Sequence, residues 1–198
     1  QGIEAFTRFD QEHDNLRAAL VWSLDIKHVN MSLRLLYHLC FYWFRRGYSH
    51  EGERWTKAAI AQAGEHESVL LCLALQWAFA FTFSQGRFGE AMPYLDRLVP
   101  MARRLEDAEA IAMSLVAYSW VSANAQEALH RLDEAIAIIQ ETDNLQHLLP
   151  MFYYTAGIWL ERSGRYNDAR DYYEKSLALY RRMGAVDLIA DPLGLLGQ

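Results

Sequence analysis

The feature that most constrains the fold of this chain is residues 151–183, where two amphipathic helical patterns flank a single glycine. Gly164 separates the patterns, and glycine readily adopts the positive φ that favours the end of a helix. On each side, apolar and small residues recur at the three- and four-residue spacing of one helix face. Small residues stand where the two helices would cross, namely Gly157, Ala169 and Ser176. The stretch therefore predicts two antiparallel helices in close contact.

This pattern resembles a tetratricopeptide (TPR) repeat, a helix–turn–helix unit of about 34 residues. The small residue of the second helix also recurs upstream, at Gly52, Ala91 and Ala135, before Ala169. Only the last interval matches the usual repeat length, so we expect longer helices or turns in the earlier repeats. The resemblance implies an all-α, right-handed TPR-like α-solenoid (superhelix) of antiparallel helix pairs, with about 9–10 helices.

We expect a single TPR-like helical repeat domain over residues 1–198. Because helical arrays end in a polar capping helix and this sequence does not, we expect the chain to be a fragment of a larger protein. The expected segments are a leading helix over 1–28, repeats over about 29–64, 67–104, 107–142 and 150–183, and a partial last helix over 185–198.

Local signals indicate where individual helices begin and end. Asp10 and Ser49 are expected N-caps, since their side-chain oxygens can accept hydrogen bonds from the first N–H groups of a helix. Pro100 is expected to bend or end the fifth helix, because proline lacks a backbone N–H. We expect the sixth helix to run from 107 past Asn124 without a clear break, and a short helix to follow over Leu132–Thr142.

Composition and charge exclude several classes of protein. Of the 198 residues, 52% are hydrophobic, which excludes an intrinsically disordered tail. The formal net charge is −6 and no basic stripe is present, which argues against direct binding of nucleic acid. The apolar runs are too short to span a membrane, and the N-terminus lacks a signal-peptide pattern. Cys40 and Cys72 lie in apolar helical runs, so we expect buried free thiols and a cytoplasmic location.

In TPR solenoids the first helix of each pair lines the concave surface, so the resemblance implies ligand-binding residues there. The wall so predicted is rich in aromatic residues and arginine, which suits an apolar peptide, a partner helix or a small organic ligand. The alternative is that these aromatic residues fill contacts between repeats, or that none of them binds anything. The candidates are Arg34, Tyr37, Phe41, Phe44, Arg45, Gln76, Ala80, Phe83, Trp120, Asn124, Glu127, Met151, Tyr154, Ile158, Glu161 and Arg162.

The N-terminal part carries a second pattern. Residues 12–20 read EHDNLRAAL and are followed by Trp22, by WFRRG at 43–47 and by EGERW at 51–55. This resembles the start of the TPR-like sensor region of bacterial STAND-type regulators, signal-transduction ATPases that include LuxR-type and antibiotic-regulatory transcriptional activators. The resemblance implies a protein, a peptide or a small-molecule inducer as partner, with ATPase and DNA-binding domains outside this chain.

No pattern in the sequence favours an enzyme. We find no nucleophile elbow, phosphate-binding loop or paired acid and base, so we expect no catalytic residue and no cofactor. Glu65, His66 and Glu67 at a helix start are interpreted as solvated capping residues and not as metal ligands. The alternative function is self-association or a scaffold that mediates oligomerisation. It is suggested by the apolar C-terminal residues Leu188, Ile189, Leu193, Leu195 and Leu196.

Overall fold

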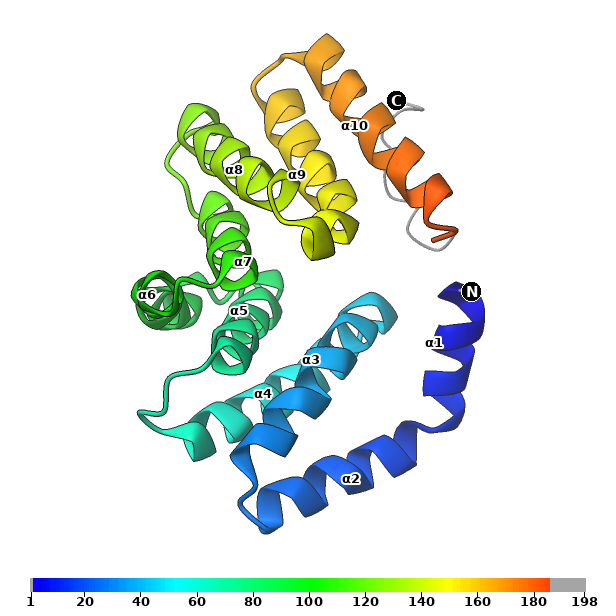
Figure 1. The fold of residues 1–198 in the computed structure, drawn as a ribbon, viewed down its shortest axis with the longest axis vertical. Helices are drawn as coiled ribbons and strands as arrows, with labels where there is room; N and C mark the ends of the chain where they lie inside the picture. Colours follow the sequence, from blue (N-terminus) through cyan, green and yellow to red (C-terminus); the bar gives the residue numbers. More distant parts are fainter. Residues whose placement is uncertain (1, 186–198) are drawn as a thin grey trace. The chain divides into compact units, whose positions relative to one another are not determined.

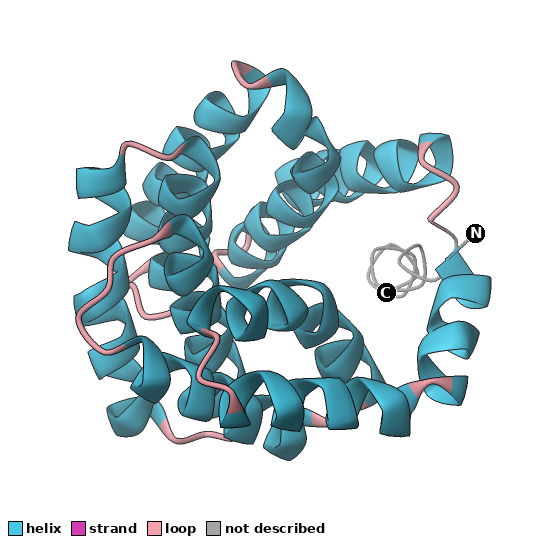
Figure 2. Cartoon of the chain, turned by 60° about the horizontal axis from the view of Figure 1, so that its bottom comes forward, coloured by secondary structure: helices cyan, strands magenta, loops and turns pink. Residues whose placement is uncertain are grey.

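The computed structural model describes residues 2–185, which are helical apart from short connections (Figures 1 and 2). Helices that follow each other in the chain pack against each other as antiparallel pairs, so the prediction of an all-α, TPR-like fold is confirmed. No helix within 2–185 has the length and apolar character needed to cross a membrane. The helices are α1 (Gly2–Gln11), α2 (His13–Asp25), α3 (Val29–Arg46), α4 (Ser49–Ala63), α5 (Val69–Ser84), α6 (Phe88–Leu105), α7 (Ala108–Ser119), α8 (Ala125–Gln140), the 3₁₀ helix η1 (Asp143–Leu148), α9 (Leu149–Arg162) and α10 (Tyr166–Arg182).

The contacts between residues divide the chain into two compact units. One unit comprises residues 6–110, and the other comprises residues 111–198 together with 1–5. The expectation of a single domain with the stated repeat boundaries stays a prediction. Apart from Ala185, the expected last helix over 185–198 and its apolar residues lie outside the described part of the chain.

In the unit of residues 6–110, helix α5 packs against α3, α4 and α6 (Figure 1). Most of its side chains are buried. Helices α4 and α5 approach closely because Gly52 has no side chain. A Cβ at Gly52 would collide with the ring of Phe81, which is fully buried. The small second-helix residue of this repeat therefore has the packing role that the sequence predicts.

A network of polar side chains fixes α2 to the pair formed by α3 and α4. The guanidinium of Arg17 donates two hydrogen bonds to the Glu51 carboxylate, at 2.5 and 2.6 Å. The indole of Trp55 donates to the same carboxylate at 3.3 Å, and the indole of Trp43 donates to His13 Nε2 at 3.3 Å. The hydrogen bond from Arg17 lowers the pKa of the Glu51 carboxyl against the opposing effect of burial. The separated parts of the N-terminal motif thus lie together where α2 packs against α3 and α4.

In the unit that begins at residue 111, helices α8, α9 and α10 pack in chain order. A Cβ at Gly157 would collide with the ring of Tyr173, and Ser176 donates a hydrogen bond of 2.7 Å to the carbonyl of Pro150. Ala169 and Leu160 lie in the same buried cluster as Tyr173. The three predicted crossing residues therefore let α9 and α10 approach closely, and the predicted positive φ at Gly164 is confirmed at 78°.

Two expected N-caps are wrong because their residues serve other roles. Asp10 lies inside α1, and its carboxylate accepts hydrogen bonds from Tyr42 Oη at 2.8 Å and from Arg46 at 2.5 Å. Ser49 is the first residue of α4, and Tyr48 precedes it as an N-cap without a side-chain hydrogen bond. The leading segment is accordingly two helices, α1 and α2, with Glu12 between them.

Pro100 does not end α6, which continues from Phe88 to Leu105 with both Pro93 and Pro100 inside it. The two prolines are seven positions apart, so they share one face, and both are exposed. The carbonyls of Gly89 and Asp96, which lose their intrahelical partners, belong to exposed residues and can bond to water. The prolines therefore stand where the carbonyls that lose a backbone donor are accessible to solvent.

The break in the third repeat also differs from the prediction. Helix α7 ends at Ser119, and α8 begins at Ala125 and reaches Gln140. The Asn124 side chain accepts a hydrogen bond of 2.9 Å from the backbone N–H of Glu127, which makes Asn124 an N-cap. The turn therefore lies at residues 120–124, upstream of the expected short helix.

Candidate functional site

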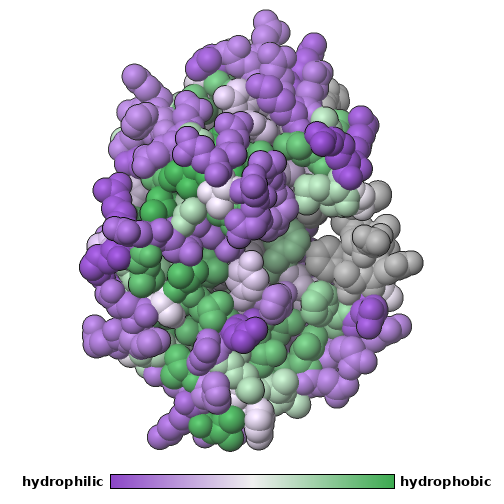
Figure 3. Space-filling model, in the orientation of Figure 1, coloured by the Kyte–Doolittle hydropathy of each residue, from purple (hydrophilic) through white to green (hydrophobic). Residues whose placement is uncertain are grey.

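The main candidate surface of the unit 6–110 is a group of aromatic rings that we call the α3–α5 aromatic cluster, composed of Phe41, Phe44, Trp77 and Phe81. The rings of Phe41 and Phe44 lie 6.3 and 5.8 Å from that of Trp77, which in turn lies 5.7 Å from Phe81. Phe41 is 37% exposed and Phe44 is 40% exposed, whereas Phe81 is buried. Hydrophobic residues gather over α3 and α5 in the space-filling view (Figure 3). The cluster thus offers accessible aromatic area on a buried base.

The sequence reasoning missed Trp77 because it chose the neighbouring stripe of α5. Gln76 is only 8% exposed, and its side-chain oxygen has no hydrogen-bond partner among residues 2–185. Phe83 stacks on Phe79 at 5.2 Å and meets Phe88 edge-on at 4.9 Å. Helix α5 is apolar on every side, so helical spacing alone could not identify its exposed face. A tryptophan in such a helix was the available signal.

The other predicted residues of α3 lie outside the aromatic cluster. The Tyr37 hydroxyl donates a hydrogen bond of 3.2 Å to Glu109, and burial followed by the charge of Glu109 raises the pKa of this tyrosine. Arg34 is exposed and Arg45 is half-buried. Tyr37 therefore ties α3 to the first turn of α7, within the unit 6–110.

The unit that begins at residue 111 holds a second candidate surface, which we call the Trp–Arg cluster and which consists of Trp120, Trp159 and Arg162. The two indole rings lie 6.3 Å apart. The guanidinium carbon of Arg162 lies 5.6 Å from the Trp120 ring centre and 5.2 Å from the Trp159 ring centre. Sequence reasoning identified Trp120 and Arg162 but not Trp159, which is 9% exposed.

The remaining candidates of this unit take part in holding its fold together. Tyr154 and Ile158 pack against the buried cluster that contains Tyr173. Glu161 accepts a hydrogen bond of 2.6 Å from the Tyr173 hydroxyl, whose pKa is raised first by burial and then by this carboxylate. Asn124 and Glu127 belong to the capping turn of α8. Met151 is half-buried in the first turn of α9.

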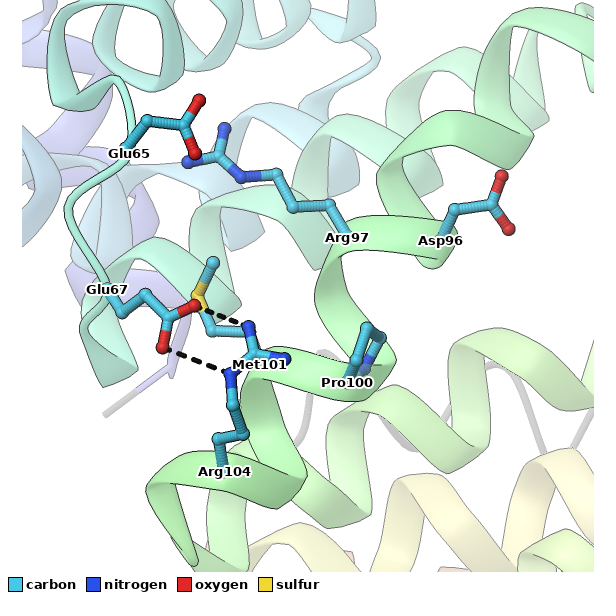
Figure 4. Close-up of a pocket in the computed structure, with 7 residues that line it drawn as sticks. All are labelled: Glu65, Glu67, Asp96, Arg97, Pro100, Met101 and Arg104. Atoms are coloured by element: carbon cyan, nitrogen blue, oxygen red, sulfur yellow. Dashed lines mark hydrogen bonds and ion pairs between the residues drawn. The ribbon is translucent and has the colours of Figure 1, made fainter.

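The described part of the chain contains no arrangement that indicates catalysis. A pocket of about 320 Å³ lies beside α6, where Arg104 binds Glu67 (Figure 4). Arg97, which also lines this pocket, donates a hydrogen bond to the carbonyl of Gly64. Within 2–185 no three His, Cys, Asp or Glu residues are placed to hold a metal ion. Cys40 and Cys72 are buried free thiols as predicted, and burial raises the pKa of each, that of Cys72 to about 11.

Comparisons with known proteins agree with this geometry. A family model described as "Tetratricopeptide repeat" matches residues 122–182, which contain α8, α9 and α10. The crystal structure of BtubC (BKLC) from P. vanneervenii is similar with a TM-score of 0.64 and 14% sequence identity, over 92% of this chain and 81% of that chain. No curated protein sequence matches the chain. The chain therefore contains a tetratricopeptide repeat region, the kind of module through which proteins bind other proteins.

Proposed function

We propose that this chain is the TPR sensor module of a multidomain bacterial transcriptional regulator of the STAND type, and that it recognises a protein or peptide through the α3–α5 aromatic cluster. The observation that supports this binding site is the exposure of Phe41 and Phe44 beside Trp77. Large aromatic side chains that a partner can bury supply much of the free energy of binding at protein interfaces. The chain itself performs no catalysis in this proposal.

The regulator context is supported by the N-terminal motif, whose residues form the junction of α2 with α3 and α4. His13, Arg17 and Glu51 belong to the motif that carries the resemblance. Arg17 pairs with Glu51 at 2.5 Å, and His13 Nε2 lies 3.4 Å from the same carboxylate. The motif therefore joins the leading helix α2 to the first helix pair, α3 and α4. The ATPase and DNA-binding domains of the proposed regulator lie outside this chain.

The binding site is tested with peptides selected from a displayed library on the immobilised chain. Phe44→Ala and Trp77→Ala are each expected to weaken the selected peptides by more than about tenfold, because each removes a ring that the partner covers. Tyr166→Ala is the matched control, since Tyr166 is 70% exposed and belongs to α10 in the other unit. Circular dichroism checks that all three variants keep their helices.

Two results would contradict the proposal. Unchanged affinity in both cluster variants would mean that the peptides bind elsewhere. A complete parent protein without nucleotide-binding and DNA-binding domains would exclude the regulator context, while leaving the peptide site intact. Thermal unfolding with small organic molecules separates an inducer from a peptide, because a ligand of the native state raises the unfolding midpoint.

A further inference from the structure

Arg162 combines three properties that no other arginine of the unit 111–185 combines. It is exposed, its guanidinium lies against two indole rings, and it forms no ion pair with any residue that the structure describes. By contrast, Arg131 pairs with Glu127 at 2.7 Å, and Arg165 pairs with Asp168 at 2.7 Å. The indole rings thus position the Arg162 guanidinium, and no described carboxylate pairs with its charge.

The neighbouring carboxylate does not fill this role. Glu161 accepts a hydrogen bond of 2.6 Å from the Tyr173 hydroxyl. Its oxygens do not form an ion pair with Arg162. The guanidinium therefore keeps its N–H donors available while it lies over the two indole rings. A cation–π contact of this kind reduces the side-chain entropy that the arginine must lose when it binds.

The polar groups of the Trp–Arg cluster are all donors. A guanidinium has five N–H donors and no acceptor, and an indole has one donor. The indole N–H of Trp159 is buried and has no hydrogen-bond partner within residues 2–185. A complementary group must consequently bring acceptor oxygens and negative charge. A carboxylate has both, and its two oxygens match the planar fork of arginine.

Resting on the proposal that this module binds peptides, we propose that the Trp–Arg cluster binds an aspartate or glutamate side chain of an acidic peptide segment. The carboxylate accepts hydrogen bonds from Arg162, and the adjoining peptide covers the half-buried ring of Trp120. The net charge of the chain is −6, so its long-range field does not attract acidic peptides. Recognition must come from this local contact.

The test uses a short oligoglutamate peptide and the oligoglutamine peptide of equal length as probes. Binding is followed by NMR through the indole N–H signals of Trp120 and Trp159, which are assigned by Trp→Phe substitution. Oligoglutamate is expected to shift both signals in a saturable manner, whereas oligoglutamine shifts neither. Arg162→Gln should weaken the binding by at least about tenfold, and Arg162→Lys should weaken it less, because lysine keeps the charge but loses the fork.

Arg170→Gln is the matched control, because Arg170 is an exposed arginine of α10 without an ion pair among the described residues. It is expected to bind oligoglutamate like the unaltered chain. Equal weakening by Arg170→Gln would show a diffuse charge effect and overturn the proposal, as would equal shifts with both peptides or no shift with either. Tighter binding of a phosphoserine peptide of the same length would assign the site to phosphate. None of these results depends on Phe44, so the aromatic-cluster site is tested separately.

Discussion

Gly52 and Gly157 each lie where the ring of a neighbouring helix fills the space that a side chain would need. The ring is Phe81 at Gly52 and Tyr173 at Gly157. Both rings are buried, so they cannot move aside without disturbing a packed core. At Gly89, near the start of α6, no atom beyond the adjoining residues and the backbone of its own helix lies within 4 Å of the position of a Cβ. Glycine is therefore required by packing at positions 52 and 157 but not at position 89.

Gly157→Ala is expected to lower the free energy of unfolding by about 1–3 kcal/mol, because the added methyl group overpacks α9 against α10. The higher helix propensity of alanine offsets this cost only in part. Urea unfolding followed by circular dichroism measures the change.

The control is Gly89→Ala, which gains helix propensity at an uncrowded position and should stabilise by roughly 0.5–1 kcal/mol. Equal stability of the two alanine variants would show that the crossing of α9 and α10 has room to spare.

At the scale of the elements, α8 begins at a well-defined cap. The Asn124 side chain accepts from the N–H of Glu127 at 2.9 Å, and the Glu127 carboxylate accepts from the N–H of Ala123 at 3.1 Å. This reciprocal arrangement satisfies backbone donors at the start of the helix. It also places the turn between α7 and α8.

Asn124→Ala is expected to lower the thermal midpoint and to cost about 0.5–2 kcal/mol of stability, because it leaves the N–H of Glu127 without its acceptor. Asn124→Asp keeps an acceptor oxygen and should retain most of the stability. Calorimetry on both variants makes the comparison. If alanine proved neutral, the side-chain hydrogen bond would contribute nothing to α8.

Elements whose signals are local could be predicted from the sequence. The α9–α10 pair followed from small residues at helical spacing and from Gly164, which adopts a φ of 78°. Features that depend on distant partners could not. Asp10 has the chemistry of a cap but is used by Tyr42 and Arg46.

The residues of the candidate site were also only partly predictable from the sequence. The rings of α3 were identified because the TPR resemblance assigns the first helix of each pair to the binding surface. Trp77 was missed because every face of α5 is apolar and only packing decides which one remains accessible. Trp159 was missed because it reaches Arg162 across a turn of α9 from a largely buried position.

For the whole molecule, we expect the response to acid to depend on Glu53, a carboxylate that is buried in ion pairs. Glu53 is 6% exposed and accepts hydrogen bonds from Gln85 at 2.9 Å and from Arg87, while Lys57 lies at 2.6 Å. Burial alone would raise the pKa of the Glu53 carboxyl, but the bonds from Lys57, Arg87 and Gln85 outweigh it and lower the pKa to about 2. The pairs therefore favour the ionised form in the folded chain.

Because the folded-state pKa is below the ordinary value of 4.5, Glu53 stabilises the fold fully above that pH, and this contribution is lost as the pH falls from 4.5 toward 2. Glu53→Gln is expected to cost roughly 1–3 kcal/mol at neutral pH and to flatten the pH dependence in that range. Urea unfolding at several pH values measures both effects.

Glu174→Gln, at an exposed position of α10, should leave the curve unchanged. An equally steep loss of stability in acid for Glu53→Gln would place the acid sensitivity at other carboxylates.

The two cysteines have a practical consequence for experiments on the native protein. Both thiols are buried in the same compact unit, Cys40 in α3 and Cys72 in α5, and these are the two cysteines of the sequence. A maleimide dye can react with them only when residues 6–110 open, because burial keeps each sulfur protonated and out of reach. The natural cysteines of the folded chain should therefore not react during site-specific labelling. In the folded protein, a single cysteine introduced on α10 would be the site that reacts with a fluorophore. The rate at which the two natural thiols react would measure how often residues 6–110 open.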